Sequence, residues 1–293
     1  GALVLNNVFM RYRLHKPYVL KGINLRISPN QKVAVCGRTG CGKSTLFSVL
    51  ARLYPISRGN ITIDNQDTQH LSLHQLRSMI QVVDQDAVLI AASLRRNLLG
   101  IFSQINNDDE DEKLKDRVSS SSSSSSFLRS PSTNSSFHKS DNSNYNNYNN
   151  NDGVIWKALE KAGLAGKVRS LPGQLDFEVT DGGSNFSSGE RQLIALARAL
   201  IAADRTRVLL CDEATAHVDL DTDEKIHDAI LDLNLTVLMI CHRLQHIHRF
   251  DCVAVLDRGR VVEFGPPRQL IKTNGSYLSK LYKHAKLQLP SSD

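Results

Sequence analysis

The sequence has no long uninterrupted hydrophobic run. A helix that crosses a membrane needs about 18 or more consecutive apolar residues, and no window of this chain reaches that length. The two richest runs, residues 193–203 and 236–241, are interrupted by Arg198 or too short. The N-terminal stretch GALVLNNVFMRYR also lacks the basic-then-apolar layout of a signal peptide. We therefore expect neither a membrane span nor a secretory leader in this sequence.

Cysteine is scarce as well. The five cysteines are an odd number, form no CxxC pair and mostly lie within apolar runs. This pattern is typical of reduced, buried thiols and argues against a disulfide framework or a zinc site. A dense stripe of Lys and Arg with interleaved aromatic residues is also missing, and the formal net charge is only +6. The composition favours a solvated surface with some preference for anions, and we expect no nucleic-acid partner.

One segment differs in composition from the rest of this 293-residue chain. Residues 103–152 contain an acidic run (108–112), an unbroken serine tract (119–126) and the stretch DNSNYNNYNNND. Such a composition buries too little apolar area to offset the entropy of ordering it. We expect a disordered insertion that serves as an inert spacer, with regulatory phosphorylation sites as the alternative.

Three apolar runs on either side of the insertion are nearly continuous: KVAVCG, RVLLCDE and TVLMICH. Runs of this kind are typical of parallel strands buried on both faces, and helical patterns lie between or after them. They favour an α/β core. Residues 3–9, 23–27 and 61–63 predict a separate, mainly antiparallel sheet, and residues 253–256 and 261–263 predict a hairpin.

The first continuous run leads into a glycine-rich loop. Residues 37–44, GRTGCGKS, fit the pattern G-x-x-x-x-G-K-[ST] between a predicted strand and a predicted helix. Glycines let successive backbone N–H groups point at phosphate oxygens, at the N-terminus of a helix. Lys43 would neutralise the β- and γ-phosphates, and the Ser44 hydroxyl would bind Mg²⁺. The sequence therefore predicts a nucleoside triphosphate site.

The run RVLLCDE ends in two adjacent acids. Asp212 lies at the carboxyl end of a predicted buried strand, where ligands bind in open α/β sheets, and it would hold Mg²⁺ through water. Glu213 would orient the attacking water or accept its proton. The alternative is that these acids cap the following helix. The phosphate loop upstream favours the catalytic interpretation.

These motifs resemble, in the same order, those of the nucleotide-binding domain of ATP-binding cassette (ABC) transporters, over essentially the whole chain outside the insertion. The resemblance implies a P-loop NTPase (RecA-like) α/β core with an antiparallel β subdomain and a helical signature subdomain. We expect a single domain over residues 1–293. Residues 1–85 would form the β subdomain and the phosphate-loop part of the core, residues 86–200 the helical subdomain, and residues 201–293 the rest of the core and the C-terminal helices.

The resemblance also implies roles for residues outside the phosphate loop. Gln85 would sense the γ-phosphate and Mg²⁺, and His242 would contact the γ-phosphate. Tyr12 would stack on adenine, a contact worth about 1–3 kcal/mol. Taken singly, each has a structural alternative: Tyr12 as an edge-strand aromatic, His242 as a helix cap and Gln85 as a loop residue. The resemblance implies that ATP is bound by Tyr12, Gly37, Arg38, Thr39, Gly40, Cys41, Gly42, Lys43, Ser44 and Thr45. It implies catalytic roles for Glu213, His242 and Gln85, and Mg²⁺ binding by Ser44, Gln85 and Asp212. It also places Asp219 in the D-loop and assigns to the signature, which would contact the partner's ATP, the residues Ser187, Ser188, Gly189 and Glu190.

Four segments narrow the resemblance to one subfamily of these transporters: PYVLKGINLRI, SLRRNL, VIWKALEKAGL and NFSSGERQLIALARALI. They resemble the second nucleotide-binding domain of the C subfamily, the multidrug-resistance-associated proteins. This implies an ATPase at the cytoplasmic face of a membrane, which pairs with another nucleotide-binding domain and with transmembrane domains to export organic anions, conjugates or drugs. Because the sequence begins directly at the first predicted strand, we expect it to be a domain of a longer polypeptide.

Two alternatives to this function stay open. The first is an ATP-sensing regulatory domain of an ABC-type channel with little turnover, and the presence of Glu213 and His242 argues against it. The second is a cassette ATPase that acts on DNA or ribosomes. Such enzymes carry coiled-coil or paired-cassette inserts, whereas the insertion here shows no heptads.

The signature departs from the family pattern. Family members usually continue Gly-Gly-Gln, whereas this chain has Ser188, Gly189 and Glu190. We expect the Ser188 side chain to crowd the facing phosphate, and the Glu190 charge to weaken attraction for a polyphosphate unless a cation lies between them. The resemblance pairs this signature with the less active of two ATP sites, so Glu213 is expected to serve the hydrolytic one.

Overall fold

The computed structural model describes residues 1–84, 87–99, 142–212, 220–285 and 287. Gln85, Glu213 and Asp219 therefore lie outside the described residues, as does most of the predicted insertion. Among the described helices, none combines the length and the apolar character needed to span a membrane.

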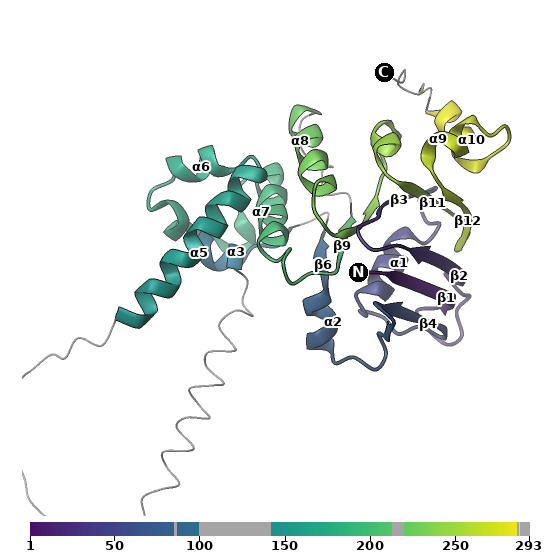
Figure 1. Ribbon diagram of the computed structural model, residues 1–293, viewed down its shortest axis with the longest axis horizontal. Coiled ribbons are helices and arrows are strands. Elements are labelled where there is room, and N and C mark those ends of the chain that lie inside the picture. Colours follow the sequence, from purple (N-terminus) through teal and green to yellow (C-terminus); the bar gives the residue numbers. More distant parts are fainter. Residues whose placement is uncertain (85–86, 100–141, 213–219, 286, 288–293) are drawn as a thin grey trace, which may run out of the picture.

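A six-stranded sheet forms the centre of the molecule, with the strand order β12-β11-β3-β10-β9-β6 (Figure 1). The strands β11, β3, β10, β9 and β6 run parallel, and β12 pairs antiparallel with β11. Every residue of β3 and β10 is buried, as expected for parallel strands covered on both faces. The α/β core and the hairpin predicted from the apolar runs are confirmed. The strands are β3 (Lys32–Cys36), β6 (Ile80–Val83), β9 (Val208–Asp212), β10 (Thr236–Ile240), β11 (Cys252–Asp257) and β12 (Arg260–Gly265).

A four-stranded antiparallel sheet lies beside this core, with the order β2-β1-β4-β5. Its strands alternate buried and exposed positions, and the buried side chains pack on one side of the central sheet and on α1. The antiparallel subdomain predicted from the sequence is thus present, with longer strands than predicted. The elements are β1 (Leu3–Met10), β2 (Leu20–Ile27), β4 (Arg58–Ile63), β5 (Gln66–Asp67) and α1 (Lys43–Leu50).

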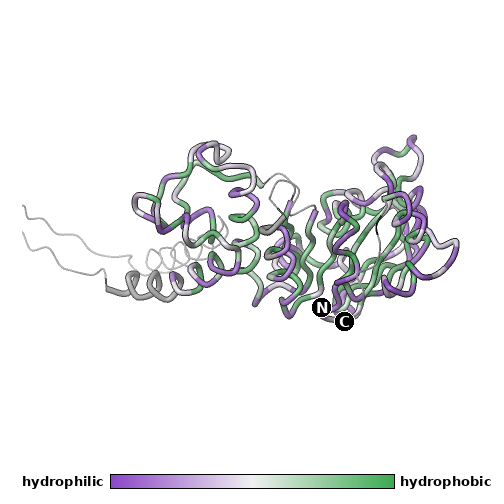
Figure 2. The backbone as a smooth tube through the Cα atoms, turned by 90° about the horizontal axis from the view of Figure 1, so that it is seen from above, coloured by the Kyte–Doolittle hydropathy of each residue, from purple (hydrophilic) through white to green (hydrophobic). Residues whose placement is uncertain are grey.

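A mostly helical subdomain extends from the opposite side of the central sheet (Figure 1). The long helix α5 packs on α7, and α7 also contacts α3 and strand β6. Figure 2 shows the same separation from above, with hydrophobic stretches in both parts. The elements are β7 (Ala92–Ser93), α3 (Leu94–Leu99), α5 (Asn142–Lys161), α6 (Ala165–Ser170), η1 (Gln174–Asp176), β8 (Glu178–Val179), η2 (Asp181–Gly183) and α7 (Ser188–Ile201).

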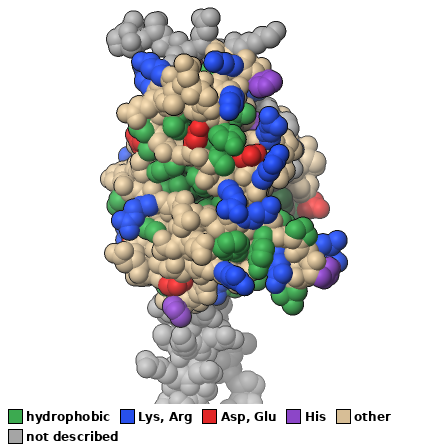
Figure 3. All heavy atoms as spheres, turned by 90° about the vertical axis from the view of Figure 1, so that its right-hand side faces the viewer, with side chains coloured by type: hydrophobic (Ala, Val, Ile, Leu, Met, Phe, Trp, Pro, Cys, Tyr) green, Lys and Arg blue, Asp and Glu red, His purple; other side chains and the backbone are tan. Residues whose placement is uncertain are grey.

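The remaining helices flank the core. Helix α2 precedes β6, helix α8 joins β9 to β10, and two short helices end the described chain, as predicted from the sequence. On the face shown in Figure 3, Lys and Arg side chains are dispersed among hydrophobic and acidic ones. The elements are α2 (Leu73–Met79), α8 (Leu220–Leu231), η3 (Leu244–Arg249), α9 (Pro267–Lys272) and α10 (Tyr277–His284).

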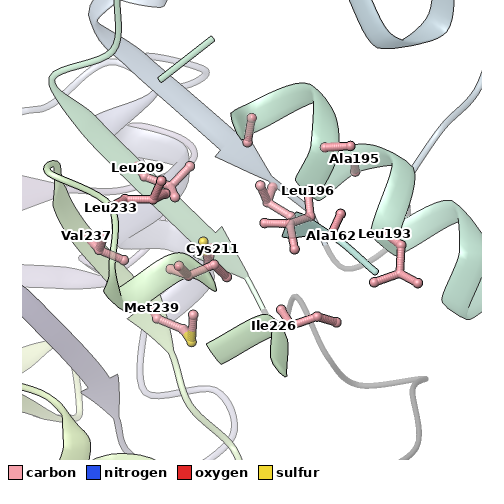
Figure 4. Close-up of a cluster of buried hydrophobic side chains, with 14 of the residues drawn as sticks. Ala162, Leu193, Ala195, Leu196, Leu209, Cys211, Ile226, Leu233, Val237 and Met239 are labelled. Carbon is pink, nitrogen blue, oxygen red and sulfur yellow. The ribbon is translucent and has the colours of Figure 1, made fainter. Parts of the chain in front are cut away.

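One hydrophobic cluster joins the helical subdomain to the core (Figure 4). Leu193 and Leu196 of α7 belong to the same cluster as Leu209 of β9 and Met239 of β10. All five cysteines are buried, as predicted, and none of them is paired in a disulfide. Burial raises the pKa of the Cys36 thiol to about 12, so this group stays protonated and packs as a small apolar side chain.

The C-terminal end of the predicted insertion, residues 103–152, overlaps helix α5. Helix α5 begins at Asn142, so residues 142–152 are helical. The same helix buries Ile155 and Leu159 in its second half. Because adding a residue to an existing helix costs much less than nucleating one, a packed second half supports extension into a polar segment. The composition of residues 142–152 does not reveal that a packed helix follows them.

Candidate nucleotide-binding site

The glycine-rich loop connects β3 to α1 and needs glycine for two different reasons. At Gly37 the loop backbone lies so close to Leu256 that an added Cβ would be 2.2 Å from the Leu256 carbonyl oxygen. At Gly42, the N-cap of α1, φ is +112°, a conformation that L side chains rarely adopt. These positions let the chain curl back at the N-terminus of α1, where unpaired backbone N–H groups attract an anion.

Lys43 is the first residue of α1 and lies inside this curl. Its side chain is buried, and its Nζ donates hydrogen bonds to the carbonyl oxygens of Gly37 at 2.9 Å and Arg38 at 3.3 Å. These two carbonyl oxygens therefore hold the Lys43 ammonium within the loop, at the end of the loop that would face a phosphate. A cation fixed in this way is preorganised for a phosphate, because little rotamer freedom remains to be lost on binding.

Ser44 and Asp212 come from distant parts of the sequence and line one cavity of about 400 Å³. Ser44 follows Lys43 on α1, and Asp212 ends strand β9. Hydroxyl and carboxylate oxygens suit Mg²⁺, which keeps several of its own waters and takes only one or two protein ligands. The donor set therefore fits the metal predicted from the sequence. The rest of the cavity is largely apolar and is lined by α1, α2 and β6.

The side chains within the loop divide into two groups. Arg38 and Thr39 are exposed, whereas Cys41 is buried. The Cys41 carbonyl accepts a hydrogen bond from Gly259 N–H at 2.9 Å, which fastens the loop to the β11–β12 turn. Burial raises the pKa of the Cys41 thiol, despite the opposing charge of Lys43. Cys41 thus contributes backbone and packing to the loop rather than a reactive thiolate.

Tyr12 lies close to the loop helix, and 48% of its surface is exposed. Its hydroxyl hydrogen-bonds with the Thr45 hydroxyl at 2.9 Å, so the ring lies over the first turn of α1. Tyr54 contacts this ring edge-on, with centroids 4.8 Å apart. The structure therefore brings two of the predicted nucleotide-binding residues together. It adds Tyr54, which no local sequence signal identified.

The signature residues form the N-terminus of α7. Ser187 is the N-cap: its Oγ accepts from Glu190 N–H at 3.2 Å, and the Glu190 carboxylate accepts from Ser187 N–H at 2.8 Å. Lys167 Nζ lies 3.0 Å from the same carboxylate. Burial favours the neutral acid, but the hydrogen bonds from Ser187 and Lys167 outweigh it and lower the pKa of Glu190.

This arrangement places a cation next to the Glu190 carboxylate and offsets its charge. No sequence pattern identified Lys167, which belongs to helix α6. Glu190 is therefore a capping residue of α7 as well as a departure from the family signature.

His242 is exposed and directly follows buried Cys241 at the end of β10. It thus lies at the same edge of the parallel sheet as Asp212, because β10 and β9 pair in parallel up to Ile240 and Asp212. Gln85, Glu213 and Asp219 were also predicted as site residues, and all three lie outside the described residues.

A glycine-rich loop with a buried lysine, on a parallel sheet that carries an aspartate at the end of another strand, defines a P-loop NTPase fold. The ABC transporter family matches residues 20–216, more than half of the chain. The chain therefore belongs to the ABC transporter family.

Curated relatives point to the C subfamily. The chain is 36% identical over 279 residues to ATP-binding cassette sub-family C member 2 of Homo sapiens, a match that covers 94% of this chain and 15% of that protein. It is 35% identical to sub-family C member 3 of Rattus norvegicus, with the same coverage. It is 36% identical over 278 residues to the oligomycin resistance ATP-dependent permease of Saccharomyces cerevisiae, covering 94% of this chain and 17% of the permease. The chain thus spans less than a fifth of the length of these relatives.

A solved structure agrees with membership of the ABC transporter family. The chain resembles a bacterial Atm1-family ABC exporter with ATP bound, with a TM-score of 0.74 and 26% sequence identity. The match covers all of this chain and 42% of that one. The likeness extends over the core, the antiparallel sheet and the helical subdomain together.

Proposed function

We propose that this chain is an ATP-hydrolysing nucleotide-binding domain that drives transport by an ABC exporter. One observation carries the proposal: Ser44 and Asp212 line the same cavity, next to the loop that holds Lys43. Lys43 would bind the phosphates of a metal-complexed triphosphate, and Ser44 and Asp212 would bind its Mg²⁺. Family membership supports ATP as the nucleotide.

The predicted site residues have distinct parts in this function. The loop N–H groups and Lys43 bind the β- and γ-phosphates, and Tyr12 stacks on the base. Ser44 and Asp212, with Gln85, would hold Mg²⁺, which would supply positive charge to the phosphate oxygens. Glu213 would accept a proton from the attacking water, and His242 would contact the γ-phosphate.

Dimerisation is the second part of the proposal. The α7 N-terminus carries Ser187, Ser188 and Gly189, exposed or partly exposed and far along the chain from the phosphate loop. A helix N-terminus favours negative charge, and we propose that it contacts the ATP of a partner nucleotide-binding domain. Asp219 would lie at the same interface. Binding of two ATP molecules would close the dimer, and hydrolysis would reopen it.

Transmembrane domains are the third proposed partner. The cavity next to Ser44 is lined by Phe47, Leu53, Leu76 and Val82, and Leu53 is 62% exposed. An apolar hollow beside a nucleotide site suits a short helix of a membrane domain, which would convert ATP binding into movement. The relatives named above support a place at the cytoplasmic face of a membrane, and their subfamily supports organic anions, conjugates or drugs as cargo.

The test is steady-state ATP hydrolysis and vesicle transport by the complete polypeptide to which the chain belongs. We expect Lys43→Ala to abolish nucleotide binding. Glu213→Gln should retain ATP but stop turnover and accumulate the closed dimer. Normal transport together with unchanged hydrolysis in both variants would refute the proposal. ATP binding with negligible turnover in the unmodified protein would favour a regulatory role in a channel.

A further inference from the structure

A fully buried carboxylate, Asp223, lies on α8 and faces the segment that follows β10. Its side chain has no exposed surface. Oδ2 accepts a hydrogen bond from Arg243 Nη1 at 3.3 Å, and Arg243 directly follows His242 in the chain. His246 Nε2 also lies 3.2 Å from Oδ2. The carboxylate thus contacts two residues of one short segment.

Arg243 is the one side chain among the described residues that donates a hydrogen bond of good geometry to the Asp223 carboxylate. His227 Nδ1 lies 3.1 Å from Oδ1, but it is also 3.0 Å from the Asp223 main-chain oxygen, to which it hydrogen-bonds. Removing the cationic partner of a buried carboxylate is strongly destabilising, because the remaining charge is left unsolvated. The fold therefore strongly favours the arrangement in which Arg243 points at Asp223.

This contact restricts the backbone next to His242. Arg243 is the N-cap of η3, and its side chain points back to α8 while 44% of it stays exposed. His242 itself is exposed. We propose that Asp223 is a positioning residue that fixes, through Arg243, the segment carrying His242. The inference rests on the proposed function, since it concerns the orientation of a group that would contact the γ-phosphate.

The surroundings of Asp223 hold several other charged or titratable groups. The rings of His227 and His246 stack, with centroids 4.8 Å apart, and Phe250 contacts His227 edge-on. Gln245 Nε2 lies 3.1 Å from His246 Nε2. Farther along the same elements, Arg249 of η3 pairs with Asp228 of α8. This second ion pair joins the same two elements, but the Asp228 side chain is 59% exposed, so it provides a matched control.

The experiment measures kcat and KM for ATP in the complete polypeptide, together with thermal unfolding, for Asp223→Asn, Arg243→Gln, Arg243→Lys and the double variant Asp223→Asn/Arg243→Gln. We expect Arg243→Gln to lower kcat about tenfold to a hundredfold, the loss typical of a misplaced group, with KM within about twofold. Arg243→Lys should recover most of kcat because it keeps a cation within reach. The double variant should be no worse than either single variant, since both remove the same contact. Asp228→Asn should leave kcat within about twofold.

Two outcomes overturn the inference. One is wild-type kcat in Arg243→Gln in a protein whose Lys43→Ala variant is inactive, and the other is an equal loss in Asp228→Asn. If Asp223→Asn does not fold, Arg243→Gln decides the result, because its half-exposed side chain can be replaced without opening the core. If Lys43→Ala is as active as the wild type, the proposed function fails instead. The two failures are therefore distinguishable.

Discussion

Lys167 Nζ lies 3.0 Å from the carboxylate of Glu190, the residue that closes the capping box of α7 with Ser187. The ion pair joins helix α6 to the N-terminus that we propose faces the partner's nucleotide. It shows how a charged residue is accommodated at an anion-facing helix end. The carboxylate accepts hydrogen bonds from the helix's own N-cap and is neutralised by a lysine.

These contacts predict that two substitutions of Glu190 differ in their effect on the free energy of unfolding. Glu190→Gln keeps an oxygen that can accept from Ser187 N–H and loses only a partly exposed ion pair, so the free energy of unfolding should change by less than about 1 kcal/mol. Glu190→Ala removes the carboxylate half of the capping box, which accepts from Ser187 N–H, and should cost about 0.5–2 kcal/mol. Urea unfolding with Lys167→Gln as the control distinguishes the two. A Glu190→Gln cost as large as that of Glu190→Ala would contradict the capping role assigned here.

The two serines on the loop helix predict different responses to Mg²⁺-ATP. Both serines line the cavity with Asp212, but the Ser48 hydroxyl is already used as a donor to the Ser44 carbonyl at 2.9 Å. Ser44→Ala should weaken Mg²⁺-ATP binding about tenfold, the value of a hydrogen bond to a charged group. Ser48→Ala should change the affinity by less than about twofold. Titration calorimetry with and without Mg²⁺ tests this, and equal effects of the two substitutions would count against a metal role for Ser44.

Two loop glycines predict unequal losses of stability. A Cβ at Gly37 would meet the Leu256 carbonyl at 2.2 Å, so Gly37→Ala should cost more than about 3 kcal/mol. At Gly40 φ is +77°, but an added Cβ meets nothing within 4 Å, so Gly40→Ala should cost only the conformational penalty of about 1–2 kcal/mol. Thermal and urea unfolding measure both variants. A smaller loss at Gly37 than at Gly40 would show that the loop readily relaxes.

The burial of His227 predicts that the folded protein loses stability as the pH becomes acidic. Burial lowers its pKa from an ordinary value of 6.5, more than the nearby Asp223 raises it. The unfolded chain therefore takes up a proton at a higher pH than the folded chain does. The stability linked to neutral His227 is complete above the unfolded pKa and is lost as the pH falls toward the folded pKa.

Urea unfolding between pH 5 and 8 checks this sign. His227→Gln should be less dependent on pH than the wild type in that range, whereas His70→Gln, at an exposed position in the β subdomain, should follow the wild type. A wild-type protein that becomes more stable on acidification through pH 6 would contradict the assignment.

The start of α5 predicts where the insertion can be removed. Replacing residues 103–141 by a short Gly/Ser linker should leave the thermal midpoint within about 3 °C, because it removes none of the described packing. Extending the deletion through Asp152 removes part of α5 and the ion pair of Asp152 with Arg95, which also pairs with Asp176 at 3.0 Å. This longer deletion should lower the free energy of unfolding by a further 1–3 kcal/mol or so. Equal stability of the two variants would show that the first turns of α5 are dispensable.

Much of the fold could be predicted from the sequence. Continuous apolar runs such as KVAVCG specify parallel strands covered on both faces, and β3 and β10 are buried at every residue. Strand β6 was not predicted, because IQVV is a four-residue strand with exposed Val82. It joins the central sheet by pairing with β9. That pairing joins residues far apart in the chain, which local patterns do not report.

The sequence by itself determined the phosphate loop, because the spacing of Gly37, Gly42 and Lys43 is a local property of one turn and one helix. Only the tertiary structure decided which partners the charged groups have. Lys167 reaches Glu190, and Arg243 reaches Asp223, through contacts between helices that are separate in the chain. The physical reason is that the energy of a charge depends on its burial and on cations and donors within a few ångströms. Chain packing sets both.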